Sequence, residues 1–441
     1  MENNKQSNKQ NSRSANKHKW LGICAAVVVM IGLAAGTAIY LYPTNPAGNT
    51  AGNAAKQPNT ENQTSEATTQ PSEAANQTSN NTTRQPETAE PEPETQLSDA
   101  EAETQQDLVT QQPETETQEP EVVEITISAV GDLTFGRNQK ASYSGSFDEY
   151  YDDYGVDYFL QNVVDVFAAD DCTIGNLEGV LTESTDIRAS KEWNHKGRPE
   201  YVNILTRGSI EVVSLGNNHI MDYNEEGVKD TIDTLENAGV TYAISGVWGD
   251  KYGMYETEKG IKIGFVSVNE YYEGNTVYTF LEDGLKQLRE QGADLVFALV
   301  HWGGDKTHII EDDQYTMGRW CVDQGYDLVL GCHPHVLQGI ECYNGKYIVY
   351  SMGNFCYGGS KNPKEKDSMI FQQTFTFVDG VLQENTTDIR AIPCRLSGKT
   401  SKNDYSPVIL DGDEAAETIQ SLNSYSKEFG IAFDNEGYLK Q

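Results

Sequence analysis

Polar residues that can do chemistry follow several apolar stretches of this 441-residue chain, each at the point where the stretch ends. The pattern recurs at five places: Gly131-Asp132, Gly175-Asn176-Leu177-Glu178, Gly216-Asn217-Asn218-His219, His301-Trp302-Gly303 and Gly331-Cys332-His333-Pro334-His335. In an α/β sheet the carboxyl ends of the strands share one edge, and ligands bind there. We therefore expect these residues to converge, although they lie far apart in the sequence.

Together these residues have the composition of a metal site. Taken singly, each has a structural explanation, since Asp132 can cap a helix, Asn218 can hold a turn, and a lone His301 is more often a core histidine than a ligand. Together they supply carboxylate and amide oxygens with imidazole nitrogens, which suit Mn, Fe or Zn better than Ca or Mg. The sequence predicts one or two divalent ions and six candidate ligands: Asp132, Glu178, Asn218, His301, His333 and His335.

A second kind of residue is needed if such a site is catalytic. Two metals bridged by a carboxylate lower the pKa of a bound water and hold an anionic ester or acyl oxygen during attack. A neighbouring imidazole that is not bound to metal can protonate the leaving group. His219 directly follows the candidate ligand Asn218 and is the predicted catalytic acid, whereas His195 and His308 are interpreted as structural histidines.

The elements that must position these residues are predicted as an α/β domain over 121–400, followed by a C-terminal helix and tail over 401–441. Strands are predicted at 122–130, 171–176, 211–215, 240–244, 261–268, 295–300, 328–330 and 347–350. Helices are predicted between them at 157–167, 225–238, 281–291 and 312–323. The segments 369–377, 380–385 and 388–393 are predicted to be antiparallel strands, and a closing helix starts near 412 with Asp411 or Asp413 as its N-cap.

The residues before this domain predict a membrane anchor and a tether. Residues 20–42 are apolar and uncharged, and at about 1.5 Å per residue they are long enough to cross a hydrocarbon core of roughly 30 Å. The basic segment 1–19 is predicted to stay in the cytoplasm, which places the main domain outside the cell. A cleaved signal peptide is the alternative. Residues 43–120 are rich in Thr, Gln, Glu and Pro and predict a disordered linker.

Charge and cysteine content argue against three classes of protein. The chain has 67 acidic and 32 basic residues, so nucleic acid is an improbable partner. Its seven cysteines are an odd number without Cys-x-x-Cys spacing, which argues against a disulfide framework and against a cysteine-type structural zinc site.

Six ordered motifs make the chain resemble the bacterial poly-gamma-glutamate capsule synthesis (CapA-type) family, itself similar to calcineurin-like metallophosphoesterases. They are VGDLTFGR (130–137), GNLEGVLT (175–182), SLGNNHIMDY (214–223), HWGGD (301–305), GCHPHVLQGIE (331–341) and YSMGNF (350–355). The resemblance implies a four-layer α/β/β/α sandwich of metallophosphoesterase type with the site between its two sheets. It also implies that Asp132, Asn218, His301, His333 and His335 are ligands, that Glu178 is the bridging carboxylate and that His219 is catalytic.

Two departures from the phosphoesterase pattern affect the expected metal count. Phosphoesterases carry Asp where this chain has Asn176, and an amide cannot bridge as an anion. Their first motif reads Asp-x-His, whereas Thr134 stands two residues after Asp132 here. The resemblance therefore implies a single ion, or two ions with unequal affinity.

Three functions remain open from the sequence. The first is a membrane-anchored protein of capsule polymer synthesis or export with a hydrolase-type metal site, whose partners are an anionic envelope polymer and capsule-synthase membrane proteins. Arg137, Lys196 and Arg198 are candidate contacts for such a polymer, or else solvated surface charges. The second is a metal-dependent phosphoesterase acting on a small substrate. The third is a non-catalytic, polymer-binding assembly subunit.

Overall fold

The computed structural model describes residues 119–440 apart from 247–249, 275 and 385–387. The predicted cytoplasmic segment 1–19, the anchor 20–42 and all but the last two residues of the linker 43–120 lie outside the described residues. Among the residues that are described, no helix is both long enough and apolar enough to cross a membrane.

The larger of the two main sheets has nine strands and mixed direction. Its path runs β18 (Val408–Ile409), β17 (Ile389–Arg395), β15 (Asp367–Val378), β1 (Val122–Thr134), β3 (Cys172–Leu177), β6 (Val212–Ser214) and β7 (Thr241–Ala243). Off this path, β14 (Asn354–Tyr357) pairs with β1 and β16 (Val381–Leu382) pairs with β15. The strands β1, β3, β6 and β7 are mutually parallel, whereas β15, β17 and β18 are antiparallel, as predicted for the last third of the chain.

The second main sheet has six strands, and a small third sheet lies beside the first. The six-stranded order is β12 (Ile340–Tyr343), β13 (Lys346–Val349), β11 (Leu328–Cys332), β10 (Leu295–His301), β9 (Lys262–Asn269) and β8 (Gly253–Glu256). Every residue of β10 and β11 is buried, because their apolar runs are covered on both faces. The small sheet joins β2 (Arg137–Asn138), β5 (His195–Gly197) and β4 (Val180–Leu181).

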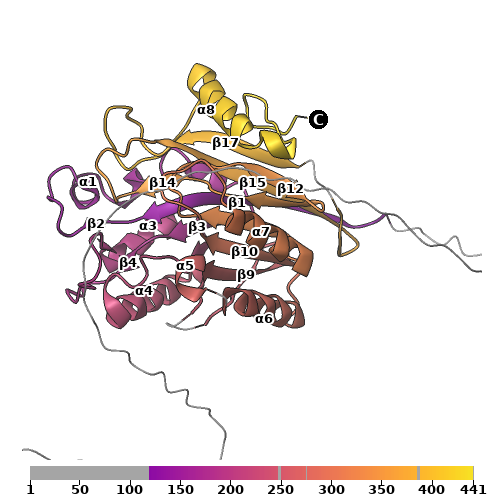
Figure 1. Ribbon diagram of the computed structural model, residues 1–441, viewed down its shortest axis with the longest axis horizontal. Coiled ribbons are helices and arrows are strands. Elements are labelled where there is room, and N and C mark those ends of the chain that lie inside the picture. Colours follow the sequence, from indigo (N-terminus) through magenta and orange to yellow (C-terminus); the bar gives the residue numbers. More distant parts are fainter. Residues whose placement is uncertain (1–118, 247–249, 275, 385–387, 441) are drawn as a thin grey trace, which may run out of the picture. The chain divides into compact units, whose positions relative to one another are not determined.

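The two main sheets pack face to face, with helices on their outer faces. Along β10, Leu295, Phe297 and Leu299 enter the core between the sheets, whereas the alternate residues face the helices. The outer face of the larger sheet is covered by α1 (Phe147–Tyr154), α3 (Val202–Arg207) and α4 (Asn224–Ala238). The outer face of the smaller sheet is covered by α6 (Thr276–Glu290) and α7 (Asp312–Gln324), and α8 (Gly412–Tyr425) lies along β17 (Figure 1). The predicted mixed α/β architecture is thereby confirmed.

The predicted helix at 157–167 is the main error in secondary structure. The chain there forms a short 3-10 turn, Val156–Tyr158, and a single helical turn, α2 (Val164–Phe167). Phe159 turns inward instead and stacks on Phe147 with a centroid distance of 4.2 Å. Tertiary packing of an aromatic side chain outweighs the weak helix propensity of this Val- and Phe-containing segment. The helix α1 was missed, although its N-cap Ser146 and the acidic residues that follow it are a recognisable start signal.

Candidate metal centre

Five of the six predicted ligands, all except Asn218, come together at the carboxyl ends of strands from both main sheets. Asp132 lies near the end of β1, Glu178 follows β3, and Asn218 and His219 follow β6 in the larger sheet. From the smaller sheet, His301 is the last residue of β10 and the loop after β11 carries His333 and His335. The parallel pairing of β1 with β3, and of β10 with β11, aligns these ends.

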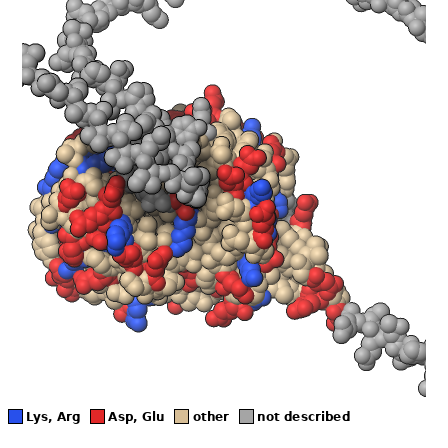
Figure 2. Space-filling view, turned by 90° about the horizontal axis from the view of Figure 1, so that it is seen from below, with Lys and Arg blue, Asp and Glu red and all other residues tan. Residues whose placement is uncertain are grey.

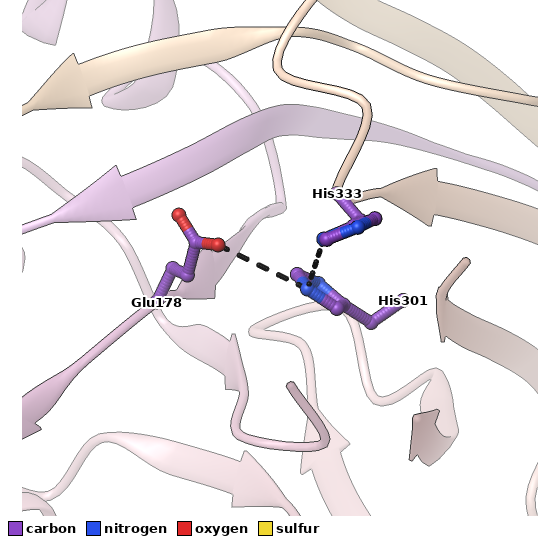
Figure 3. Close-up of side chains that lie close together, drawn as sticks. All are labelled: Glu178, His301 and His333. Carbon is purple, nitrogen blue, oxygen red and sulfur yellow. Dashed lines mark hydrogen bonds and ion pairs between the residues drawn. The ribbon is translucent and has the colours of Figure 1, made fainter. Parts of the chain in front are cut away.

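The side chains form two groups that share one carboxylate. Glu178, His301 and His333 make one group, and Asp132, Glu178 and His335 make the other, with all ligand atoms of a group within 4.8 Å of one another. Glu178 Oε1 lies 3.9 Å from His301 Nε2 and 3.6 Å from His335 Nε2. Figure 3 shows the Glu178 carboxylate directed toward the His301 ring, with His333 directly above that ring in this view. Glu178 therefore occupies the place that a bridging ligand requires.

The charge balance of these groups fits a bound cation. Asp132 Oδ2 and Glu178 Oε1 are buried and accept no well-directed hydrogen bond from the described residues, although Asp132 Oδ2 lies 2.9 Å from His335 Nδ1. Burial raises the pKa of Glu178 to about 8. Burial opposes the charge on His335, but Glu178 and Asp132 outweigh it and raise the pKa of His335 to about 10. The two ring nitrogens of His335 thus face the carboxyl groups of Asp132 and Glu178, and these oxygen and nitrogen donors match a divalent metal.

The other two histidines are available as neutral ligands. Burial, together with the nearby His335, lowers the pKa of His333 to about 4. Burial and His333 hold the pKa of His301 well below its usual value. Because a metal binds the unprotonated nitrogen of imidazole, both rings are in the form that coordination requires.

The loop that carries His333 and His335 has a strained backbone. The φ angles are 102° at His333 and 59° at His335, in a region that side chains other than glycine rarely adopt. The strand β14 holds this loop, since Asn354 Nδ2 donates to the His335 carbonyl at 3.1 Å. On the other side, Lys306 N donates to the Pro334 carbonyl at 2.8 Å. Backbone strain of this kind clusters at functional sites, where it directs side chains that the fold would not otherwise aim together.

Two asparagines that were not predicted as site residues support the ligands. Asn176 Nδ2 donates to Asp132 Oδ1 at 2.7 Å and lies 3.3 Å from His301 Nδ1. Asn217 Nδ2 donates to Asn176 Oδ1 at 3.2 Å, and its Oδ1 accepts from the His219 backbone N–H at 3.0 Å. Both asparagines lie within the sequence motifs, and this position could have identified them as site residues. Their role is orientation, because an amide at position 176 contacts two candidate ligands at once.

His219 belongs to a hydrogen-bonded cluster at the edge of the site. Its Nδ1 lies 2.6 Å from Asp222 Oδ2, and Lys191 Nζ lies 3.0 Å from Asp222 Oδ1. Burial, followed by the charge of Lys191, holds the pKa of His219 well below its usual value. Asp222 and Lys191 were not predicted, although a carboxylate three residues after His219 is a signal for such a pair. Lys191 Nζ also lies 3.1 Å from Nδ1, so both polar neighbours contact this nitrogen and leave Nε2 as the one that can exchange a proton.

His195, interpreted from the sequence as a structural histidine, lies against His219. The two rings are 4.3 Å apart between centroids, and the His195 backbone N–H donates to Asp222 Oδ2 at 2.6 Å. The Nδ1 atom of His195 is buried and has no hydrogen-bond partner among the described residues, and the same holds for Asn218 Oδ1. His308, by contrast, stacks on Tyr425 and contacts the Leu337 carbonyl at 2.7 Å. The sequence could not separate these two histidines, since their neighbours come from distant segments.

The three cations considered as candidate polymer contacts have partners within the protein. Arg137 Nε lies 2.7 Å from Asp148 Oδ2, and Arg198 lies 2.6 Å from Asp152. Lys196 Nζ donates to the Ser184 carbonyl at 2.8 Å. All three thus have partners within the protein, which neither a polymer contact nor a solvated surface charge requires. Lys191 is a cation next to the site, with Nζ 3.1 Å from His219 Nδ1.

The geometry defines a mixed α/β protein with a buried carboxylate and histidine centre at its strand ends. The family described as "Bacterial capsule synthesis protein PGA_cap" matches residues 126–358, and the chain belongs to this family. The matched residues contain every candidate ligand together with His219. The resemblance inferred from the motifs is confirmed.

Curated relatives include two Bacillus proteins. "Capsule biosynthesis protein CapA" of Bacillus anthracis is 29% identical over 269 residues, which cover 56% of this chain and 63% of that protein. "PGA biosynthesis protein CapA" of Bacillus subtilis (strain 168) is 31% identical over 265 residues, which cover 56% of this chain and 67% of that protein. The chain thus spans about two thirds of the length of these relatives.

Solved structures show only a distant likeness. A hypothetical protein from Thermus thermophilus has 15% identity and a TM-score of 0.39, covering 61% of this chain and 98% of that chain. The 5'-nucleotidase from Candida albicans has 12% identity and a TM-score of 0.38, covering 70% of this chain and 58% of that chain.

Proposed function

We propose that this protein acts in the synthesis or export of a poly-gamma-glutamate-type capsule polymer and that its site is a metal-dependent hydrolase centre. The observation that carries the proposal is the Glu178 carboxylate, which is shared by two histidine-containing groups and has a buried oxygen without a directed hydrogen bond from the described residues. Membership of the capsule synthesis family supplies the biological setting.

The ligand sets follow from the two groups. Glu178, His301 and His333 would hold one ion, with Asn218 from the neighbouring loop as a further candidate. Asp132, Glu178 and His335 would hold the other. Glu178 would then be the bridging carboxylate, a role for which the phosphoesterase pattern has an aspartate at position 176. When bound, Mn, Fe or Zn ions supply Lewis-acid polarisation of an oxygen and a water of lowered pKa.

Side chains of the protein would accept and donate the proton during the reaction. Neutral His219, held through Nδ1 by Asp222, can accept a proton at Nε2 from the attacking water. It can then return that proton to the leaving amine of a cleaved amide bond. Lys191 keeps Asp222 in place through a 3.0 Å ion pair and so supports the orientation of His219.

The location proposed for this chemistry is the outer face of the cell membrane. Residues 20–42 would form a single-pass anchor with 1–19 in the cytoplasm, and 43–120 would tether the main domain outside. The partners would be the anionic envelope polymer and capsule-synthase membrane proteins, and not nucleic acid.

A non-catalytic, polymer-binding role is the second candidate. Thr134 and Asn176 replace an imidazole and a carboxylate of the phosphoesterase pattern, which weakens the case for turnover more than the case for a bound ion. A small-substrate phosphoesterase is the third outcome that the same experiment distinguishes.

The test compares metal content and turnover of the full-length protein with those of two ligand variants. Glu178→Gln removes the shared anion, so we expect it to lose all bound metal, whereas Asp132→Asn should lose only the ion on its own side. Glu341→Gln is the matched control, because Glu341 is also buried but is paired with Arg319 away from the site. Metal is measured by mass spectrometry, and turnover is measured on poly-gamma-glutamate chain length and on a chromogenic phosphodiester.

Each outcome selects one function. Metal-dependent shortening of the polymer supports the proposal, and hydrolysis of the phosphodiester alone favours the small-substrate phosphoesterase. Bound metal and polymer without turnover of either substrate favours the assembly subunit. A wild-type protein that takes up no Mn, Fe or Zn contradicts the metal centre itself.

A further inference from the structure

Thr134 stands where the phosphoesterase pattern has a metal-binding histidine, and in this fold it contacts the shared carboxylate. Its side chain is fully buried, and its Oγ1 donates to Glu178 Oε2 at 3.1 Å. Thr134 is the last residue of β1, two residues after Asp132, so both side chains leave the strand on the same face. Where the phosphoesterase pattern has an imidazole that binds metal directly, position 134 of this chain therefore supplies a hydrogen-bond donor to the candidate ligand Glu178.

The end of β1 holds Glu178 at two points. The Glu178 backbone N–H donates to the Leu133 carbonyl at 2.9 Å, and the Thr134 hydroxyl holds the far end of the same residue. Thr134 is itself fixed, since the Gly358 N–H donates to its carbonyl at 2.7 Å. The Glu178 side chain is therefore anchored at its base and at one of its two carboxylate oxygens.

This anchoring decides which oxygen faces the histidines. The terminal torsion of a glutamate side chain is broad, so an unheld carboxylate can rotate. With Oε2 bonded to Thr134, Oε1 is the oxygen that lies 3.6 Å from His335 Nε2 and 3.9 Å from His301 Nε2. Glu178 and Thr134 are both fully buried, so loss of the hydroxyl would leave Oε2 without the donor that the fold supplies.

We propose that Thr134 is a positioning residue for the metal centre, and that its hydroxyl orients Glu178 so that both ligand groups can use the same carboxylate. The inference rests on the proposed function, because it requires the centre to bind metal. Because Glu178 belongs to both groups, loss of the hydroxyl weakens every bound ion rather than one. Loss of a hydrogen bond to a ligand typically lowers metal affinity about 10-fold to 100-fold.

The test is a titration of the chelator-stripped, full-length protein with Mn²⁺, and in parallel with Zn²⁺, by calorimetry. Electron paramagnetic resonance of bound Mn²⁺ reports the number of ions and their magnetic coupling. Thr134→Val keeps the shape and removes the hydroxyl, whereas Thr134→Ser keeps the hydroxyl and removes the methyl group. Thr173→Val is the matched control, since Thr173 Oγ1 donates to Asp170 Oδ2 at 2.7 Å at the opposite end of the adjacent strand β3.

We expect Thr134→Val to bind each ion about 10-fold to 100-fold more weakly, with Thr134→Ser and Thr173→Val close to wild type. Equal affinity of Thr134→Val and wild type would overturn the inference and leave the metal centre standing. Equal loss in Thr134→Ser would also overturn it, because packing of the methyl group would then be the cause. A wild type that binds neither ion overturns the proposed function and this inference together. Should Thr134→Val not fold, Thr134→Ala makes the same comparison without a branched side chain.

Discussion

At the residue scale, the cluster of His219, Asp222 and Lys191 is the part of the site most directly suited to proton transfer. Asp222 accepts from the His219 ring, from the His195 backbone and from Lys191, so one buried carboxylate orients three groups. Neither of the two candidate metal groups includes His219. Its removal should therefore separate proton transfer from metal binding.

His219→Ala is expected to lower turnover of whichever substrate the wild type cleaves by about 10²-fold to 10⁴-fold, the usual contribution of a general acid or base. Metal content should stay at the wild-type level, because the two ligand groups remain intact. The measurement pairs initial rates with metal analysis of the same preparation. His308→Ala is the control variant, because His308 lies away from the site. Unchanged rates in His219→Ala would rule out a proton-transfer role for His219.

At the element scale, the position of the site depends on how the two main sheets dock. The ligands come from β1 and β3 on one side and from β10 and β11 on the other, so packing between the sheets sets their separation. Phe297 of β10 is central to this contact. The centroid of its ring lies 5.6 Å from the ring centroid of Phe375 in β15 and 5.8 Å from that of Phe265 in β9. Aromatic packing between the sheets thus supports the candidate metal centre from a distance.

Phe297→Ala is expected to lower the free energy of unfolding by about 3–5 kcal/mol, because it removes a large buried side chain and leaves a cavity. Phe297→Leu, which fills most of that volume, should cost less than about 1.5 kcal/mol. Chemical denaturation of the metal-free protein measures both. A similar cost for the two variants would contradict an interior that depends on close packing at this position.

At the scale of the whole molecule, acidic side chains dominate the charge. The chain has 67 acidic and 32 basic residues, and on the face shown in Figure 2 acidic patches outnumber the basic ones between them. Such a surface repels a polyanionic polymer at long range, so recognition would depend on the centre itself. Some of the acidic groups are partly buried, and they make the stability of the domain depend on pH.

Asp170 gives a defined pH window for this effect. Burial raises the pKa of Asp170 from 3.8 to about 7. Between these values the folded protein binds a proton that the unfolded chain does not, so the stabilising contribution is present at low pH and is lost as pH rises toward 7. Asp170→Asn should therefore raise the melting temperature relative to wild type by several degrees at about pH 8, and have little effect at about pH 4. Thermal melts of both proteins between about pH 4 and pH 8 measure this difference in melting temperature. A difference that does not change with pH would contradict the raised pKa of Asp170.

The sequence alone was enough to predict most strands, the mixed α/β class, the family and the convergence of the motif residues. Apolar runs such as 295–300 and the polar residues at their ends are local signals, and parallel strands bring such ends to one edge whatever the details of packing. The helix predicted at 157–167 failed, because the packing of Phe159 on Phe147 is not a local property.

Only the tertiary structure showed which histidines share Glu178 in each group, that Asn176 supports ligands, and that His195 but not His308 lies at the site. These relations join residues from different sheets and from the small sheet beside them. Their distances depend on the twist and docking of whole layers, which no local sequence pattern encodes. Residue type and spacing determine which groups are available, and the packing of the two sheets decides which of them touch.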